Sequence, residues 1–316
     1  MKKITALVLA SLLIVLSLAA CQTKSGVDSF GGTTPNQTAN LPASATENPN
    51  TPENPPAAQP SSAAITVISR EEGSGTRGAF TELFGVLDAD KVDQTTDRAE
   101  ITNSTSVMMT SVAGNPDAIG YISLGSLNNT VKAVKIDGVE ASVANINNGS
   151  YKISRPFNIA VKDGTNVLAQ DFINYIMSSN GQDIVEANGY IRVADTGAYG
   201  GSKPSGKIVV GGSSSVSPVM EKLIEAYLAV NTGADIELQT SDSSTGMKNA
   251  VDGVCDIGMA SRELKDSELE AGLSEITLAM DGIAVIVNNG SVVDNLTKEQ
   301  VMKIFTGEVT GWSEVR

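Results

Sequence analysis

The sequence predicts an α/β fold with mostly parallel sheets, and two observations lead to this prediction. From Ala64 onward, short β-like runs alternate with helix-like runs, which is the pattern of parallel strands connected by helices. Three of the β-like runs are each followed by a loop rich in serine and glycine and then by a helix start. About 250 residues follow Ala64, which is long enough for two modest lobes.

The first loop, residues 70–77, follows the apolar run 65–68 and precedes a helix-like run that begins near Gly78. Its glycines let the backbone approach a ligand closely, its hydroxyls are donors, and the helix start adds free N–H groups. Its first arginine is a permanent cation whose planar fork of donors suits two oxygens of one tetrahedral anion. The residues that supply these groups are Arg70, Gly73, Ser74, Gly75 and Thr76. This combination predicts an oxyanion site.

Two further loops of this kind follow later in the chain. Residues 211–218 (GGSSSVSP) follow the β-like run 207–210, and residues 241–246 (SDSSTG) follow the alternating run 235–239. Serine, threonine and aspartate also cap helices, so each loop alone has a purely structural explanation. Three such strand–loop–helix units together with one arginine favour convergence on a single anion.

Five longer motifs contain or follow these loops. They are ISREEGSGTRGAF (68–80), GGSSSVSPVMEKLIEAY (211–227), SDSSTGMKNAVDGVCDIGMASRELK (241–265), DGIAVIVN (281–288) and LTKEQVMKIFTGEVTGWSEV (296–315). They resemble the phosphate-binding lipoproteins of bacterial phosphate ABC importers, over nearly all of residues 64–316. The resemblance implies a two-lobe, periplasmic-binding-protein-like fold of type II, in which crossover strands join two α/β lobes and the ligand lies between them.

The order of these motifs differs from the order in that family. In the family, the GSSSVSP-like segment lies near the start, and the SREEGSGTR-like segment comes directly after the FTGxxxxWxEV-like segment. Here the SREEGSGTR segment comes first, and residues 194–206 connect the family's usual C-terminus to its usual N-terminus. This order indicates a circular permutant. A truncated product of two fused binding proteins is the alternative.

With this order, one lobe is split and the other is continuous. The split lobe combines residues 64–155 with residues 281–316, and the continuous lobe is residues 156–280. The expected crossover strands are residues 157–161 and 282–288.

The resemblance also implies the residues that bind phosphate. The expected set is Arg70, Ser74, Gly75, Thr76, Ser214, Ser215, Ser243, Ser261 and Asp281. By contrast, Ser213, Ser217 and Ser244 are expected to cap helices or to pack. Glu72 is expected either to orient the arginine of the first loop or to be a solvated charge.

Selectivity for phosphate over sulfate depends on an acceptor for the proton that phosphate keeps at neutral pH, because a fixed carboxylate repels an unprotonated oxygen. Some family members carry an aspartate where this chain has Ser261, whose hydroxyl both donates and accepts. Asp281 is the candidate replacement, and Asp242 is the second candidate. Arg262 is either a second cation for the anion or part of a surface ion pair.

The N-terminus predicts export and a lipid anchor. A basic start and the apolar run 4–18 precede the sequence LAAC, and the run is too short and too close to the N-terminus for a spanning helix. We therefore predict a lipoprotein signal peptide at residues 1–20 and a lipid on Cys21, which anchors an extracytoplasmic protein to the outer face of the cell membrane. An ordinary signal peptide with a chance cysteine is the alternative. Residues 21–63, rich in Pro, Thr, Asn and Ser, predict a disordered tether.

Composition excludes several other functions. The net charge of −14 argues against nucleic-acid binding, and the absence of histidine removes the usual general base and the commonest zinc ligand. The acidic residues lack EF-hand spacing, and Cys255 is expected to be a buried free thiol. We therefore expect no cofactor, no metal and no enzyme activity.

These observations together predict a monomeric receptor that binds inorganic phosphate between two lobes and delivers it to the permease and ATPase complex of an ABC importer. The alternative from another class is a surface protein that senses anions or adheres through the same cleft without transport. A phosphoester hydrolase is disfavoured because the base and the metal ligands are missing. Permease and ATPase genes beside this one would favour the transport function over the sensing one.

Overall fold

The structure is a computed structural model that describes residues 63–194 and 196–315. The predicted signal peptide, the lipid on Cys21 and residues 21–62 of the predicted tether lie outside this part of the chain. Within these two ranges, no helix combines the length and the apolar character that crossing a bilayer requires.

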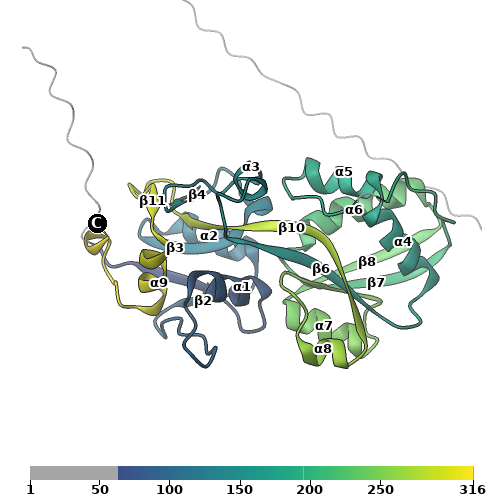
Figure 1. Ribbon diagram of the computed structural model, residues 1–316, viewed down its shortest axis with the longest axis horizontal. Coiled ribbons are helices and arrows are strands. Elements are labelled where there is room, and N and C mark those ends of the chain that lie inside the picture. Colours follow the sequence, from purple (N-terminus) through teal and green to yellow (C-terminus); the bar gives the residue numbers. More distant parts are fainter. Residues whose placement is uncertain (1–62, 195, 316) are drawn as a thin grey trace, which may run out of the picture. The chain divides into compact units, whose positions relative to one another are not determined.

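Most strands of the described residues form one nine-stranded sheet, in the order β2-β1-β3-β10-β6-β9-β7-β8 with β4 paired to β10 (Figure 1). These strands are β1 (Thr66–Arg70), β2 (Glu100–Thr102), β3 (Ala118–Ser123), β4 (Lys132–Ala133), β6 (Ser154–Lys162), β7 (Gly206–Ser213), β8 (Ala234–Ser241), β9 (Ile257–Ala260) and β10 (Leu273–Val287). Two short strands, β5 (Lys135–Ile136) and β11 (Asn295–Leu296), form a separate parallel pair.

Helices follow most of the strands. The α-helices are α1 (Gly75–Phe84), α2 (Thr105–Gly114), α3 (Val143–Asn147), α4 (Val167–Met177), α5 (Ser179–Ala187), α6 (Ser217–Val230), α7 (Ser243–Val251), α8 (Asp266–Glu270) and α9 (Lys298–Thr306). Two short 3₁₀ helices are η1 (Leu124–Ser126) and η2 (Trp312–Glu314). The helices α1, α6 and α7 begin in the three serine-rich loops that the sequence indicates.

Strand β10 is long enough to belong to both halves of the sheet. From Leu273 to Gly282 it pairs with β6, and from Ile283 to Val287 it pairs with β3, antiparallel in both cases. Beside this centre, β9 pairs antiparallel with β6. Further out, β1 pairs parallel with β2 and β3, and β7 pairs parallel with β8 and β9. The α/β fold with two crossover strands is therefore confirmed. The crossover strands pair antiparallel because the chain runs along β6 in one direction and returns along β10 in the other.

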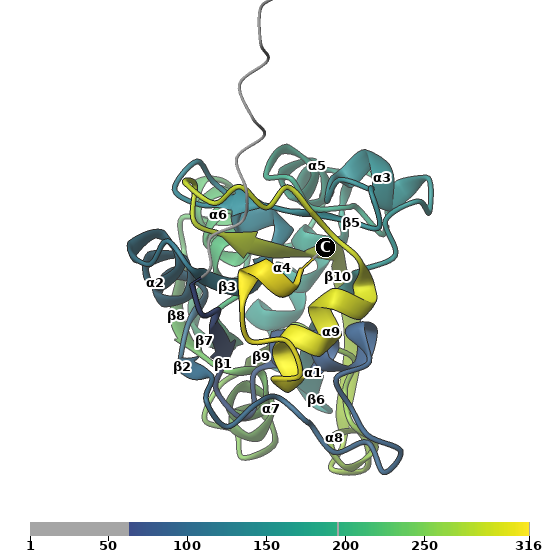
Figure 2. The same cartoon turned by 90° about the vertical axis from the view of Figure 1, so that its left-hand side faces the viewer.

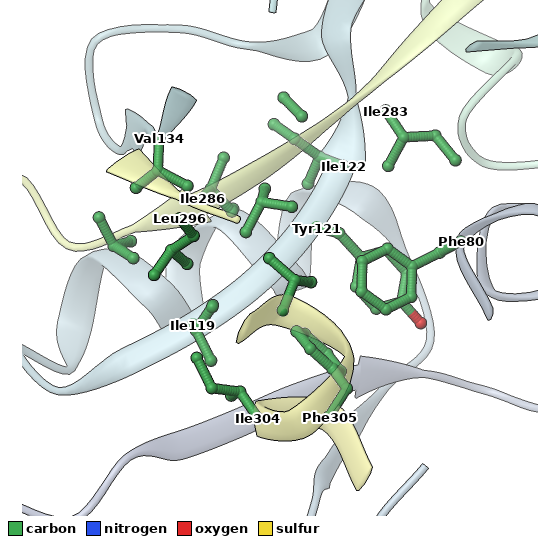
Figure 3. Close-up of a cluster of buried hydrophobic side chains, with 14 of the residues drawn as sticks. Phe80, Ile119, Tyr121, Ile122, Val134, Ile283, Ile286, Leu296, Ile304 and Phe305 are labelled. Atoms are coloured by element: carbon green, nitrogen blue, oxygen red, sulfur yellow. The ribbon is translucent and has the colours of Figure 1, made fainter. Parts of the chain in front are cut away.

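Buried apolar side chains form two main clusters. The first draws on residues 67–153 and 283–312, and the second draws on residues 157–279. Figure 3 shows the centre of the first cluster, where Phe80, Tyr121 and Phe305 meet from α1, β3 and α9. The rings of Phe80 and Tyr121 stack with centroids 3.9 Å apart, and those of Phe80 and Phe305 meet edge to face at 4.5 Å. The division into a split and a continuous lobe stays a prediction, but the two clusters draw on the same sets of residues.

The two ends of the described chain lie together in the first cluster, where α9 is next to α1 (Figure 2). The amide of Ile65 donates to the Thr310 carbonyl at 2.8 Å, and the Trp312 amide donates to the Ala63 carbonyl at 3.2 Å. The Trp312 indole is 3% exposed, and its Nε1 donates to the Asp117 carbonyl. Trp312 is thus a packing residue.

Several hydrogen bonds hold the segment that connects α5 to β7 against the second cluster, and some of them end on one carboxylate. Asp171 of α4 is buried and accepts hydrogen bonds from the Tyr199 hydroxyl, from the Tyr227 hydroxyl at 2.7 Å and from the Ser202 amide at 2.9 Å. Burial alone would raise the pKa of Asp171, but the hydrogen bonds from these partners lower it by a larger amount. The pKa therefore lies below its ordinary value. The connection is therefore held in part by an ionised group. Cys255, also in this half, is a buried free thiol as expected.

Candidate anion-binding site

Two of the serine-rich loops cap the helices that follow them. The Ser74 Oγ accepts a hydrogen bond from the Arg77 amide at the start of α1, and the Asp242 carboxylate accepts one from the Thr245 amide at the start of α7. Capping thus accounts for the side chains of Ser74 and Asp242. Neither of these two groups needs a ligand to be satisfied.

The remaining hydroxyls converge on one buried group, which we call the hydroxyl cluster. Its members are Thr76, Thr105, Ser213, Ser215, Ser243 and Ser261, all at most 4% exposed. The Ser261 Oγ is the centre, lying 3.0 Å from the Ser213 Oγ and 3.4 Å from both the Thr76 Oγ1 and the Ser243 Oγ. The Ser215 Oγ lies 2.7 Å from the Thr76 Oγ1 and 3.1 Å from the Thr105 Oγ1. Hydroxyls from five loops, those after β1, β2, β7, β8 and β9, therefore share one site.

Two members of this cluster depart from the sequence analysis. Ser213, the last residue of β7, was expected to cap a helix or to pack, and its hydroxyl donates to the Ser261 hydroxyl. Thr105 was not expected at all. The sequence does contain a signal for it, because β2 is followed by Asn-Ser-Thr-Ser at the start of α2. This is a fourth strand, hydroxyl loop and helix in succession, but its loop lacks the glycines of the other three.

Arg70 lies at the end of β1 with its side chain 2% exposed. Its Nη2 donates to the Ser214 Oγ at 3.0 Å, and its Nε and Nη2 donate to the two carboxylate oxygens of Glu71 at 2.7 Å each. Its Nη1 is buried and has no partner among the described residues. A buried, unpaired N–H group on a permanent cation is an unsatisfied donor that an anion would satisfy.

Of the two roles considered for Glu72, the exposed position of its side chain fits the solvated charge. Glu71, not Glu72, orients the guanidinium. The backbone amide of Glu71 still bonds to the Thr102 carbonyl and so continues β1, whereas the chain turns at Glu72 and leaves that side chain exposed.

The glycines of the first loop approach the loop at 241–246 and the residues just after β9. A Cβ on Gly75 would lie 2.5 Å from the Ser243 Oγ and 2.8 Å from the Ser261 Oγ. Gly73 has φ +90°, and its carbonyl accepts hydrogen bonds from the amide and the hydroxyl of Ser244, each at 3.2 Å. The lack of a side chain at both glycines permits this contact.

Asp281 pairs with Arg155, which in turn bonds to the Ser261 carbonyl. The aspartate is 1% exposed, one of its oxygens lies 3.3 Å from Arg155 Nη2, and the other accepts from the Gly125 amide at 3.2 Å. Burial raises the pKa of Asp281 to about 6, although Arg155 opposes this shift. Contact between Asp281 and an anion stays a prediction. Arg262 forms an ion pair with Glu268 at 2.8 Å rather than with Glu263 or Asp266, and its Nη2 also reaches the Ser244 Oγ.

Arg155 is a further buried residue that the sequence analysis did not consider. It begins the apolar stretch of β6, is 3% exposed, and donates from Nη1 to the Ser261 carbonyl at 3.1 Å. A charged arginine within an apolar strand is rare unless it has a partner. Its presence in this sequence was therefore the clue that Arg155 takes part in a buried interaction.

The chemistry of this arrangement is that of a binding site for a small oxyanion. It combines hydroxyl donors, an unpaired arginine N–H group and the starts of α1, α6 and α7. In the described part of the chain, no three His, Cys, Asp or Glu side chains are grouped so that they could hold a metal ion. The hydrogen bonds of the cluster join hydroxyls to one another and not to a general base.

We expect Gly75→Ala to destabilise the protein by roughly 1–3 kcal/mol, because the new methyl group would overlap the hydroxyls of Ser243 and Ser261. Gly78→Ala, in the same helix, is the matched control, since no atom lies within 4 Å of the added Cβ. The free energy of unfolding of the control variant should rise by about 0.4–1 kcal/mol, because alanine favours a helix more than glycine does. Urea unfolding of both variants measures the two values. Equal effects of the two substitutions would show that the loops do not approach each other at Gly75.

Comparison with known proteins places this chain in a family. It matches the PBP superfamily domain over residues 39–180 and 197–315. Phosphate-binding protein PstS 2 of Streptococcus agalactiae serotype V is 55% identical over 260 residues, which cover 81% of this chain and 89% of that protein. The protein of the same name from Streptococcus pneumoniae serotype 4 is 44% identical over 262 residues, covering 82% and 90%.

A solved structure agrees with these matches. The crystal structure of a phosphate ABC transporter, phosphate-binding protein from Streptococcus pneumoniae TIGR4 superposes with a TM-score of 0.64 at 44% identity, covering 80% of this chain and all of that one. The fold, the serine-rich loops and these relatives agree, and the chain belongs to the PstS phosphate-binding proteins of the PBP superfamily.

Proposed function

We propose that this protein is an extracytoplasmic receptor that binds inorganic phosphate and delivers it to the permease of an ABC importer. The observation that carries the proposal is the unpaired Nη1 of Arg70 beside a buried cluster of hydroxyls. The relatives named as phosphate-binding proteins of a phosphate ABC transporter support the same ligand. The protein is a binding protein and not an enzyme.

Hydroxyl groups suit an anion that keeps a proton. Phosphate at neutral pH presents both unprotonated oxygens and a P–OH group, and each hydroxyl of serine or threonine both donates and accepts. The helix starts and Arg70 compensate the negative charge of the phosphate locally. A positive molecular surface is therefore not needed, in a chain whose net charge is −14. The residues proposed to surround the anion are Arg70, Ser74, Gly75, Thr76, Ser214, Ser215, Ser243 and Ser261.

Arg70→Ala should weaken phosphate binding by about 2–5 kcal/mol, because it removes the charged partner of a desolvated anion. Calorimetric titration of the full chain with phosphate measures the change. Arg98→Ala is the control, because Arg98 is exposed and its hydrogen bond goes to the Gly307 carbonyl. A loss below about threefold in Arg70→Ala would place the anion elsewhere.

We also propose that the chain is a circular permutant with a split and a continuous lobe. Two observations support this. Residues 63–65 bond to residues 310–312, so a peptide could join the two ends. The PstS of Bacillus subtilis is 32% identical over only 120 residues, 37% of this chain, whereas the S. agalactiae PstS 2 aligns over 260 residues.

A rearranged gene tests the permutation. A short glycine-serine linker would join the C-terminal end to Ala63, and new termini would open between Gly200 and Gly201. This restored order should fold and bind phosphate within about tenfold of the original chain, because termini that lie close tolerate such a change. A folded rearranged chain that has lost binding, or one that does not fold, would favour the truncated fusion.

We propose that Cys21 carries a lipid and anchors the receptor to the outer face of the cell membrane. The sequence LAAC at residues 18–21 supports this proposal. Cys21→Ser should move the protein from the membrane fraction to the medium and abolish incorporation of labelled palmitate. Membrane retention of the variant at the wild-type level would contradict a lipid at this residue.

A further inference from the structure

Arg155 and Asp281 form a buried ion pair across the two crossover strands. They lie opposite each other in the register of β6 and β10, and both are at most 3% exposed. The Arg155 Nη2 lies 3.3 Å from an Asp281 oxygen. Removing either charge from water costs several kcal/mol, so a pair at this position calls for an explanation beyond stability.

The pair is in contact with the proposed anion site through Ser261. Arg155 Nη1 donates to the Ser261 carbonyl, and the Ser261 hydroxyl is the centre of the hydroxyl cluster. Burial lowers the pKa of Arg155 to about 10, the Asp281 carboxylate opposes this shift, and the charge of Arg70 adds to it. Arg155 therefore stays charged at neutral pH. Its charge and that of Arg70 are close enough to interact.

The surroundings of Asp281 are polar but contribute little charge. The Gly125 amide of η1 donates to it, and the Ser123 hydroxyl of β3 lowers its pKa. Burial raises the pKa of Tyr190, which follows α5, and the Asp281 carboxylate adds to this shift, so this phenol stays neutral over the physiological range. Arg155 on β6 is the cation that acts on the carboxylate, while its own Nε has no partner in the described part of the chain.

We propose that Arg155 is a positioning residue and a second positive charge of the anion site, and that Asp281 acts as the counter-ion that limits this charge. This inference rests on the proposed phosphate site. The Arg155 guanidinium holds the backbone at Ser261 by its hydrogen bond to the Ser261 carbonyl. Its positive charge also attracts an anion bound at the hydroxyl cluster. Asp281 reduces that attraction because its carboxylate lies against the same guanidinium.

The proposal predicts opposite effects for the two members of the pair. Arg155→Gln should weaken phosphate binding by about tenfold or more, because one buried positive charge near the anion is lost. Asp281→Asn should strengthen binding by about tenfold, because the guanidinium then acts on the anion unopposed. If the pair served packing alone, both variants would bind more weakly, and that result would overturn the proposal.

Calorimetric titrations of the full chain with phosphate and with sulfate measure these effects. Arg155→Lys, which keeps the charge, should recover most of the affinity that Arg155→Gln loses. Arg192→Gln is the matched control, since Arg192 is part-exposed and pairs with Asp183 and Glu186. If Asp281→Asn strengthens sulfate binding but not phosphate binding, the carboxylate contacts the anion directly and the counter-ion role is wrong.

A pH series provides a second readout. Because burial raises the pKa of Asp281 to about 6, the wild-type carboxyl becomes neutral as the pH falls below that value. The tenfold advantage of Asp281→Asn over the wild type should therefore be present at about pH 8 and disappear towards about pH 5. The ionisation of phosphate itself cancels in this ratio. A ratio that is constant over the series would overturn the proposal.

Arg155→Gln leaves Asp281 buried without a cation and is at risk of unfolding, which thermal melts will reveal. In that event, the double variant Arg155→Gln/Asp281→Asn is compared with Asp281→Asn alone. The double variant should bind phosphate about tenfold more weakly, and equal affinity would overturn the proposal. A wild-type chain that binds no phosphate would refute the proposed function itself, and the titration of the wild type comes first for that reason.

Discussion

The pairing of β10 with both β6 and β3 is the constraint on which the rest of the structure depends. One continuous strand belongs to both hydrophobic clusters, so the loops after β1 and after β7 are held at fixed positions relative to each other. The contact between Thr76 and Ser215 joins residues 139 positions apart in the chain. A neutral hydrogen bond contributes only about 0.5–1.5 kcal/mol, which is too little to close such a loop without the sheet.

Hydroxyl groups explain how an acidic chain can hold an anion. Serine and threonine donate and accept, so the six members of the cluster satisfy one another when they face no ligand and can turn their O–H groups towards one that enters. A cluster of carboxamides or lysines would leave donors unpaired or repel one another in the same space. Two buried positive charges lie next to these hydroxyls, those of Arg70 and Arg155, and each lies against one carboxylate.

Much of the fold and part of the site were predictable because both follow from local patterns. Alternating elements and three serine-rich loops indicated the α/β class and most of the hydroxyl cluster. Thr105 was missed because its loop lacks glycine, and Arg155 was missed because its importance depends on which strand lies opposite. Which of Glu71 and Glu72 reaches Arg70 depends on where β1 stops and the chain turns, and element ends are where local patterns carry least information.

The unequal distribution of aromatic residues gives the protein two built-in optical probes. Its single tryptophan, Trp312, is buried in the first cluster, whereas Tyr175, Tyr199 and Tyr227 contact one another in the second. Two of those phenols bond to the ionised Asp171, which ties their absorption and emission to the integrity of that connection. Tryptophan emission therefore reports on the packing of one half alone. The near-ultraviolet tyrosine signal comes from both halves, because Tyr121 and Tyr151 lie in the first cluster, and the part of it that does not follow Trp312 reports on the second. The order in which the two halves gain their packing can be followed without attaching a label.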